Sequence, residues 1–382
     1  MNVTQKVAAE FARGRREGQK RSADLSSRWG FKKDPFAGEL PSQDSFVGHE
    51  VEVVKLARAI GRSVAGTGEV LACIGALGVG VSTTLRTVHQ SLQESGSVSG
   101  LLVEGKQLTQ EHIPSRDEDE ETTSVSYFDY LISKTDFRKV RYLIIDDADD
   151  VADLLGSFVD RIHSATDTFR VPVTIIIGLH MAGWLSVDAS FRGMVGEQIW
   201  IGPLEPEQIV ELLKRRIAEA KGQNDSSPFD IDSLARVAVL SCGLALIALT
   251  IARIVLSDAS ARGSSRIQVT QVDDVARAFG LRMSEEMKAW RQSRDDARSA
   301  VMRALTHHPQ GMTTTQLAAE SLIGRTTVGY HLASLESLGA VARKRAGRDV
   351  YYAPTLAGRC ILDLLVFNQL CSQEGDCSTI PA

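Results

Sequence analysis

Two short segments in the first half of the chain carry residue types that handle phosphate and metal ions. The first is Gly75-Ala-Leu-Gly-Val-Gly-Val-Ser-Thr-Thr84, which matches the phosphate-loop pattern G-x-x-x-x-G-K-[ST] except that valine replaces the lysine. In that pattern backbone amides surround the phosphates, and the lysine neutralises the β- and γ-phosphates. The second is Leu143-Ile-Ile-Asp-Asp147, an apolar run that ends in two acids. Together they predict a nucleotide site without its loop cation.

The residues of these two segments have distinct expected roles. Nucleotide contacts are expected from Gly75, Gly78, Val79, Gly80, Val81, Ser82 and Thr83. Ser82 and Asp146 are the expected ligands of Mg²⁺, because a loop hydroxyl and a strand-end carboxylate hold the metal in phosphate-loop ATPases. Asp147 takes the place of the general base, where glutamate is usual and aspartate is one methylene shorter. The cofactor that suits such a site is ATP or ADP with Mg²⁺, bound weakly; the alternatives are an empty site and a loop kept only for its fold.

A phosphate loop needs a strand before it and a helix after it, and the sequence predicts both. The apolar run 70–74, bounded by glycines, predicts a buried parallel strand, and residues 83–92 predict the following helix. Further strands are predicted at 100–104, 141–145 and 171–177. Because helical patterns alternate with these strands, we predict an α/β core with a parallel sheet over residues 46–202.

The pattern changes after Pro203. Four helical segments with no strand between them predict a small helical domain over 203–290, at residues 205–222, 231–242, 244–256 and 272–281. The last segment, 291–382, combines three predicted helices with two strands, at 298–306, 313–320, 326–338, 340–344 and 349–353. That order is the plan of a winged helix-turn-helix domain.

The predicted winged helix carries side chains that suit nucleic acid. Residues 326–338 would be the recognition helix in the major groove, after a turn at 321–324 in which Gly324 can adopt the left-handed conformation. Contacts with double-stranded DNA are expected from Arg325, Thr326, Thr327, Tyr330, His331, Arg343, Lys344, Arg345 and Arg348. The four cations between the two strands predict a wing that touches phosphate or the minor groove. The alternative is a winged helix that serves only protein contacts.

Charge is unevenly distributed along the chain. The formal net charge is −5, yet residues 1–33 hold nine Lys/Arg against three acids, and residues 297–359 hold eight against three. Basic ends on an acidic body predict contact with a polyanion. Residues 1–45 have few clustered apolar side chains, so we expect a flexible basic arm that ends in the aromatic stretch 29–36. The alternative is a solvated tail without a partner.

Composition argues against several classes of protein. No uninterrupted apolar run approaches ~18 residues, so no membrane partner is expected. The N-terminal stretch lacks the apolar core of a signal peptide, and we therefore expect a cytoplasmic, nucleoid-associated protein. The five cysteines show no metal-ligand spacing. Formation of a homo-oligomer stays open at this point.

The order of these parts resembles AAA+ ATPases of the initiator clade, above all the archaeal Orc/Cdc replication-initiator family. The resemblance covers residues ~45–355 and rests on Phe46-Val-Gly-His-Glu50, the glycine loop, the Asp146-Asp147 pair, the helical segment and the winged helix. It implies an AAA+ parallel-sheet core, a helical lid and a C-terminal winged helix. It also implies that the winged helix and parts of the AAA+ module bind DNA.

The sequence departs from this family where charge on the phosphates is handled. The loop lysine is Val81, and the sensor-1 position after the predicted strand at 171–177 offers His180. The family's lid motif Gly-Asp-x-Arg is replaced by Gly243-Leu-Ala-Leu246, which has no arginine. The candidate for the arginine finger that the family has before Glu197 is Arg192. An arginine finger alone contributes about 10³–10⁵ in rate. We therefore predict weak or absent ATP hydrolysis.

Three functions follow as hypotheses. The first is a double-stranded DNA-binding protein of the Orc/Cdc-like type, at origins or elsewhere on the chromosome, with little or no hydrolysis. The second is an active ATP-dependent DNA-binding switch, in which Lys106 or a lysine of the basic arm supplies the missing cation. The third is a winged-helix transcription regulator or nucleoid-organising protein that uses the AAA+ fold as a scaffold. Phosphate release and genome-wide occupancy separate the three.

Overall fold

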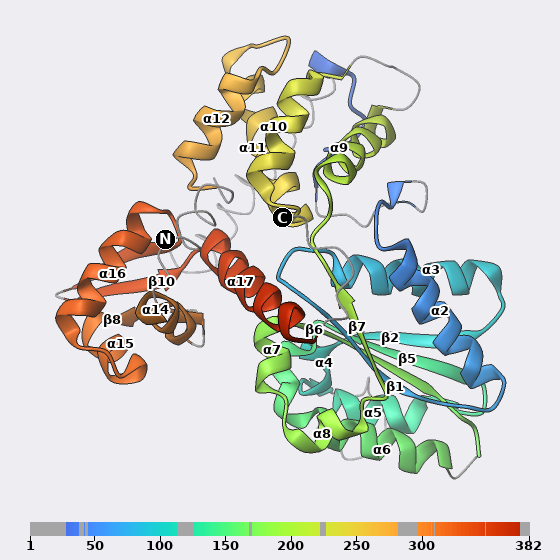
Figure 1. Cartoon of the computed structure of the whole chain (residues 1–382). Coiled ribbons are helices and arrows are strands. Elements are labelled where there is room, and N and C mark those ends of the chain that lie inside the picture. The colour runs from blue at the N-terminus through green and yellow to red at the C-terminus, as the bar shows by residue number, and fades with distance from the viewer. Residues whose placement is uncertain are drawn as a thin grey trace, which may run out of the picture. The chain divides into compact units, whose positions relative to one another are not determined.

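The computed structural model describes residues 28–37, 42, 45–112, 125–167, 170–221, 227–281, 296–306, 308, 310–347 and 349–374 (Figure 1). The chain divides into two compact units. One comprises Gly48–Pro203 and Asp363–Ala382, and the other Met1–Val47 and Leu204–Leu362. Most of the predicted basic arm and an acidic run at 117–121 lie outside the described residues. Among the described helices, none is both long and apolar enough to cross a bilayer.

The first unit is built on a five-stranded sheet in the order β2-β5-β6-β1-β7, in which every pairing is parallel. The strands are β1 (Val70–Gly75), β2 (Ser99–Glu104), β5 (Val140–Asp146), β6 (Thr174–His180) and β7 (Glu197–Ile201). β1 is buried along its whole length, as expected for a parallel strand covered on both faces. Because the strands are parallel, their carboxyl ends share one edge of the sheet. The predicted α/β core is confirmed.

Helices cover both faces of this sheet (Figure 1). α2 (Glu50–Val64) and α3 (Val81–Ser95) lie on one face, and α6 (Leu155–Asp167), α7 (Met181–Ser186) and α8 (Ala189–Met194) on the other. The remaining elements are α4 (Gly105–Leu108), β3 (Glu111–His112), β4 (Val125–Ser126), α5 (Tyr127–Lys134) and the 3₁₀ segment η2 (Ala148–Leu154). β6 runs three residues beyond its predicted end at residue 177, so His180 is its last residue. β7 was absent from the prediction because only alternate residues of this edge strand are buried.

Among the described residues of the lid, the four predicted helices are α9 (Pro206–Lys221), α10 (Ile231–Ser241), α11 (Ala245–Arg262) and α12 (Val269–Ala278). The aromatic stretch 29–36 packs on this lid. Phe31 is buried, the ring of Phe36 meets that of Phe229 edge to face at 5.8 Å, and the Lys32 amide donates to the Ala220 carbonyl at 2.8 Å. The expectation of a flexible arm is therefore wrong for this stretch, because its aromatic rings are covered by the lid.

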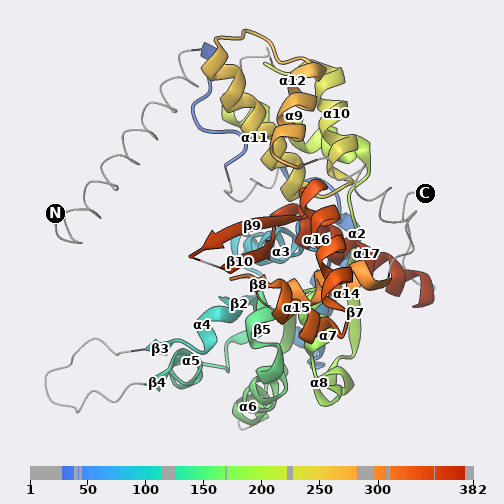
Figure 2. The same cartoon turned by 90° about the vertical axis from the view of Figure 1, so that its left-hand side faces the viewer.

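The winged helix follows the predicted order (Figure 2). Its elements are α14 (Asp296–Thr306), β8 (Met312–Thr313), α15 (Thr314–Ser321), α16 (Arg325–Ser337), β9 (Val341–Ala346), β10 (Asp349–Pro354) and α17 (Leu356–Glu374). The strands form an antiparallel sheet in the order β8-β10-β9. The turn before α16 differs from the prediction in one detail. Leu322 adopts the left-handed conformation with φ 57°, whereas Gly324 has φ −57° and extended backbone.

Candidate nucleotide and DNA sites

The glycine loop joins β1 to α3 at the carboxyl edge of the sheet. Gly78 and Gly80 have φ of 90° and 118°, values that side chains rarely allow, so the loop depends on glycine at both positions. The Val79 amide closes a turn on the Ala76 carbonyl at 3.2 Å, and His49 Nε2 lies 3.2 Å from the Val79 carbonyl. Burial lowers the pKa of His49. The loop thus keeps the backbone form that presents amides of a helix N-terminus to an anion.

Val81 is part of the core beneath the loop. The residue is only 4% exposed. A Cβ on Gly75 would lie 2.8 Å from Cγ2 of Val81, and a Cβ on Gly178 would lie 3.5 Å from its Cγ1. The valine therefore points inward between β1 and β6. No residue of the loop 75–83 brings a cation to the phosphate position.

Asp146, the expected metal ligand, is paired with a cation of the same chain. Its residue is fully buried, and Oδ2 accepts a hydrogen bond from Arg86 Nε at 3.0 Å. Nη2 of Arg86 also donates to Glu104 at 3.2 Å. Asp146 Oδ1 is buried and has no hydrogen-bond partner among the described residues. Mg²⁺ usually keeps several of its waters when proteins bind it. A carboxylate with no exposed surface and a guanidinium partner does not fit a hydrated Mg²⁺ held with Ser82.

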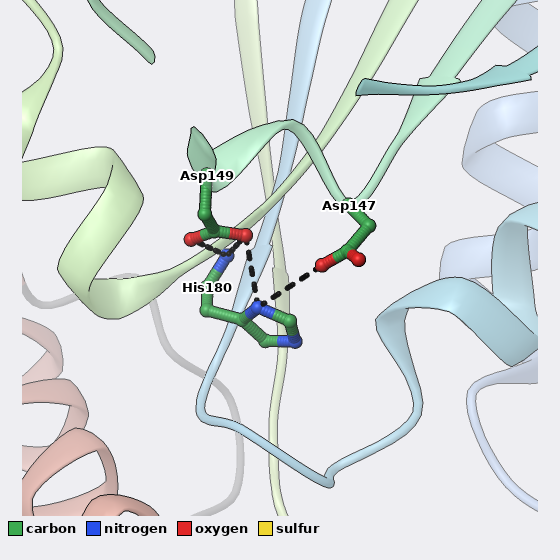
Figure 3. A group of neighbouring side chains, drawn as sticks. All are labelled: Asp147, Asp149 and His180. Atoms are coloured by element: carbon green, nitrogen blue, oxygen red, sulfur yellow. Dashed lines mark hydrogen bonds and ion pairs between the residues drawn. The ribbon is translucent and has the colours of Figure 1, made fainter. Parts of the chain in front are cut away.

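Past Asp146, the chain forms an ion-pair cluster of two acids and a histidine (Figure 3). Nδ1 of His180 lies 2.9 Å from Asp149 Oδ2 and 3.9 Å from Asp147 Oδ1. Asp149 also accepts from the backbone amides of His180 at 3.0 Å and Gly183 at 3.1 Å. Burial alone would lower the pKa of His180, but the Asp149 hydrogen bond and the charges of Asp149, Asp363 and Asp147 outweigh it and raise the pKa to about 9. His180 is therefore a cation at neutral pH, one strand away from the loop.

The same three side chains offer ligand atoms within 4.8 Å of one another, which is a spacing that can hold a metal ion. Asp149 already accepts two backbone amides, and the imidazole donates to it. To bind a metal, the imidazole would first have to lose the proton that it donates to Asp149. Burial raises the pKa of Asp147, which was expected to be the general base, and its side chain is half exposed. The cluster therefore serves to hold His180 in place.

Two further positions were expected to supply transition-state charge. Arg192 stacks over the Trp184 ring at 5.4 Å and donates to the carbonyls of Trp184 and Leu185 at 3.0 and 3.1 Å. Its guanidinium is thus used within its own chain. The lid segment at 243–246 begins α11 and has no arginine. Neither position places a cation at the phosphate loop.

The recognition helix α16 has one buried face and one exposed face. Arg325, Thr326 and Thr327 are exposed at its N-terminus, and Tyr330 is 70% exposed. His331 was expected to face DNA, but it is only 5% exposed and lies in the buried row with Val328, Leu332 and Leu335. The prediction for His331 is therefore wrong, because residues 328, 331, 332 and 335 form the face that packs into the domain.

The wing is a hairpin of β9 and β10. Arg343, Lys344 and Arg345 all lie on β9 and are exposed, while Tyr351 and Tyr352 pair opposite Lys344 and Arg343 and are half buried. Arg348 lies outside the described residues. The three described cations and the N-terminal residues of α16 therefore provide exposed positive charge and hydrogen-bond donors in one small domain.

Three residues of these sites did not stand out in the sequence. Arg86 follows Ser82 by four residues, which places both on one face of α3, and that spacing is the signal that could have found it. Asp149 lies in an acid run in which nothing distinguishes it from Asp150. Asp363 is 286 residues from Leu77, to which it is hydrogen-bonded. No local pattern predicts a pairing of that separation.

Comparison with known proteins agrees with this architecture. The IclR helix-turn-helix domain family matches residues 299–345. An uncharacterised HTH-type transcriptional regulator of Methanocaldococcus jannaschii is 21% identical over 168 residues, which span 44% of this chain and 40% of that protein.

Two solved structures share the fold over most of their length. The Orc1 protein of Aeropyrum pernix, solved in complex with DNA, has a TM-score of 0.52 and 15% identity, covering 90% of this chain and 98% of that one. Cdc6p from Pyrobaculum aerophilum has a TM-score of 0.50 and 18% identity, covering 89% and 98%. The chain therefore has the AAA+ fold of the Orc1 and Cdc6 proteins, and residues 299–345 are similar to the IclR helix-turn-helix domain.

Proposed function

We propose that this protein binds double-stranded DNA through its winged helix and hydrolyses ATP weakly or not at all. The observation that carries the proposal is the exposed surface formed by the N-terminus of α16 and the cations of β9. Arg325 can donate two hydrogen bonds to guanine in the major groove, and Arg343, Lys344 and Arg345 suit the phosphate backbone. The fold shared with a DNA-bound Orc1 protein supports origin or chromosome binding.

The proposed lack of efficient hydrolysis rests on the charges around the phosphate loop. Val81 replaces the loop cation, Arg86 pairs with Asp146, and Arg192 is used by Trp184 and Leu185. Phosphoryl transfer depends on positioning and on cations that stabilise the transition state. The side chains that would stabilise the transition state are therefore replaced or paired with other groups. His180 is the cation that lies near the loop, and it is paired with Asp149.

The test is duplex binding measured by fluorescence anisotropy at several salt concentrations, with phosphate release measured on the same sample. We expect affinity to fall by orders of magnitude as salt rises, because neutralised phosphates release counterions. We expect no phosphate release above background, with or without DNA. Absence of duplex binding at low salt would refute the proposal. A release rate that Asp146→Ala abolishes would favour the ATP-dependent switch.

A second candidate function is transcriptional regulation, favoured by the IclR-type helix-turn-helix match and the regulator from M. jannaschii. Both functions use the same DNA-binding surface, so the occupancy of the protein on its chromosome separates them. Few intergenic sites next to regulated genes would favour a regulator. A small number of origin-like sites would favour an initiator, and broad coating would favour chromosome organisation.

A further inference from the structure

The C-terminal half of α17 packs on the AAA+ core through one face of the helix. Residues from Asp363 onward belong to the same compact unit as the sheet and the glycine loop. Phe367 is buried, and its ring meets that of Trp200 on β7 at a centroid distance of 5.9 Å. Asp363 lies one helical turn before Phe367 and therefore on the same face. This face brings a carboxylate to the carboxyl edge of the sheet.

Asp363 is bonded directly to the phosphate loop. Its Oδ2 accepts a hydrogen bond from the Leu77 amide at 3.0 Å, and the residue is 7% exposed. Leu77 is the third residue of the loop that begins at Gly75. A carboxylate offers the loop the same kind of acceptor as a phosphate, namely an oxygen with negative charge.

The surroundings compensate the charge of this buried carboxylate. Burying an ionised acid is costly unless it is paired and hydrogen-bonded. The loop provides an amide and leads into α3, a helix of 15 residues whose N-terminus favours an anion. The charge of Asp363 is also among those that raise the pKa of His180, so the carboxylate and the imidazolium attract each other electrostatically. Asp363 is thus held at the start of the glycine loop, next to the amides expected to receive a phosphate.

We propose that Asp363 is a built-in anionic ligand of the glycine loop, which competes with the polyphosphate of a nucleotide for that loop. Both ligands are anions at the same glycine loop, so their negative charges repel each other and disfavour simultaneous binding. With valine at position 81, the loop has no side-chain cation to hold a polyphosphate against the carboxylate. Nucleoside triphosphate enters only when Asp363 leaves. This inference goes beyond DNA binding and does not depend on it.

The test compares the affinity of the full chain for ATP and for inorganic tripolyphosphate, both without Mg²⁺, by isothermal titration calorimetry. The variant is Asp363→Asn, which removes the charge and keeps an oxygen that can accept from Leu77. Asp232→Asn is the matched control, because Asp232 is an exposed acid on α10 and the change in charge is the same. Asp363→Ala is a second variant that also removes the acceptor. Thermal unfolding and duplex binding show that each variant is folded.

We expect Asp363→Asn to bind both ligands at least tenfold more tightly than the parent, and Asp232→Asn to match the parent. In the parent, tripolyphosphate must displace the Asp363 carboxylate. The affinity of the parent for tripolyphosphate should therefore increase less with decreasing salt concentration than the affinity of Asp363→Asn. NMR should show the pKa of His180 falling in Asp363→Asn, since a neighbouring negative charge is lost. The proposal is overturned if Asp363→Asn and Asp363→Ala bind no more tightly than the parent, including the case in which none of them binds. Loss of duplex binding by wing variants leaves these outcomes unchanged, so the two proposals fail separately.

Discussion

Nε of Arg86 lies 3.0 Å from Oδ2 of Asp146, so the acid that would hold a metal in an active ATPase is paired with a cation from the helix that follows the loop. Asp146 is fully buried and Arg86 is about one-third exposed. Breaking a buried pair by removing one partner is costly, because the remaining charge stays away from water. The same ion pair therefore stabilises the core and prevents Asp146 from serving as a metal ligand.

Arg86→Met should destabilise the protein by about 3 kcal/mol, because it leaves the buried Asp146 carboxylate without its cation. The measurement is urea unfolding followed by circular dichroism. Asp146→Asn in the same chain should restore part of the loss, since the double variant buries no unpaired charge. Arg138→Met, which removes the partner of Asp136 on the surface, is the control and should change little. Equal effects of Arg86→Met and Arg138→Met would contradict this account.

Val81→Lys should not restore ATP hydrolysis, although it recreates the complete loop pattern. Val81 points inward between β1 and β6, and Asp146 remains paired with Arg86. The measurement is steady-state phosphate release with Mg²⁺, with and without duplex DNA. Ser82→Ala in the Val81→Lys chain serves as the control for any background release. A rate that depends on both the introduced lysine and Ser82 would show that the missing lysine alone had disabled the site.

Much of the fold could be predicted from the sequence, because its signals are local. The buried runs of β1 and β5, the glycines of the loop and the helical periodicity of the lid each lie within a few residues. The winged helix was likewise predicted from its order of elements. The contacts that define the candidate site are not local. The pairs Arg86–Asp146 and Leu77–Asp363 are separated by 60 and 286 residues, so only the folded chain shows them.

His331 shows a different limit of sequence reasoning. A histidine beside an exposed tyrosine on a recognition helix suits DNA, and its polarity favours the outer face. It is buried because positions 328, 331, 332 and 335 form one stripe on α16. Helical periodicity was the better guide there than residue type. In the stretch 29–36, likewise, burial of the aromatic side chains determines the structure, although the surrounding residues are basic.

The pH dependence of stability should change when His180 is replaced by glutamine. The pKa of His180 in the folded protein is about 9, above its usual value of 6.5. Its stabilising contribution is therefore complete below pH ~6.5 and is lost as the pH rises through 9, with a limit of roughly 3 kcal/mol. The groups that face it are Asp149, Asp147 and Asp363.

The corresponding measurement is urea unfolding of parent and His180→Gln at pH 6, 7.5 and 9. The difference in unfolding free energy should be largest at pH 6 and smallest at pH 9. His163→Gln, at an exposed position of α6, controls for the substitution itself. A difference that is constant across this range would mean that His180 is not held as a cation by the neighbouring acids.

Tyr330 and His331 are neighbours on α16 and should respond in opposite ways. Tyr330→Ala should weaken duplex binding without changing the unfolding midpoint, because Tyr330 is 70% exposed. His331→Ala should lower the unfolding midpoint, because it leaves a cavity in the domain, and should leave the preferred DNA sequence unchanged. Selection from random duplexes, together with thermal unfolding, measures both effects. If His331→Ala alters the preferred bases in a fully folded chain, the assignment of His331 to the buried face of α16 is wrong.

The most direct test of DNA binding is the salt dependence of duplex affinity when Arg343, Lys344 and Arg345 are all replaced by alanine. The matched control replaces Lys55, Arg58 and Lys134, three exposed cations of the AAA+ core, and so removes the same charge. We predict that the wing variant binds more weakly, with a slope of log K against log salt that falls by about 0.9 for each lost phosphate contact. The control variant should keep the slope of the parent. Parent-like affinity of the wing variant at every salt concentration, with a reduced slope for the core variant, would contradict the account and place DNA binding on the core.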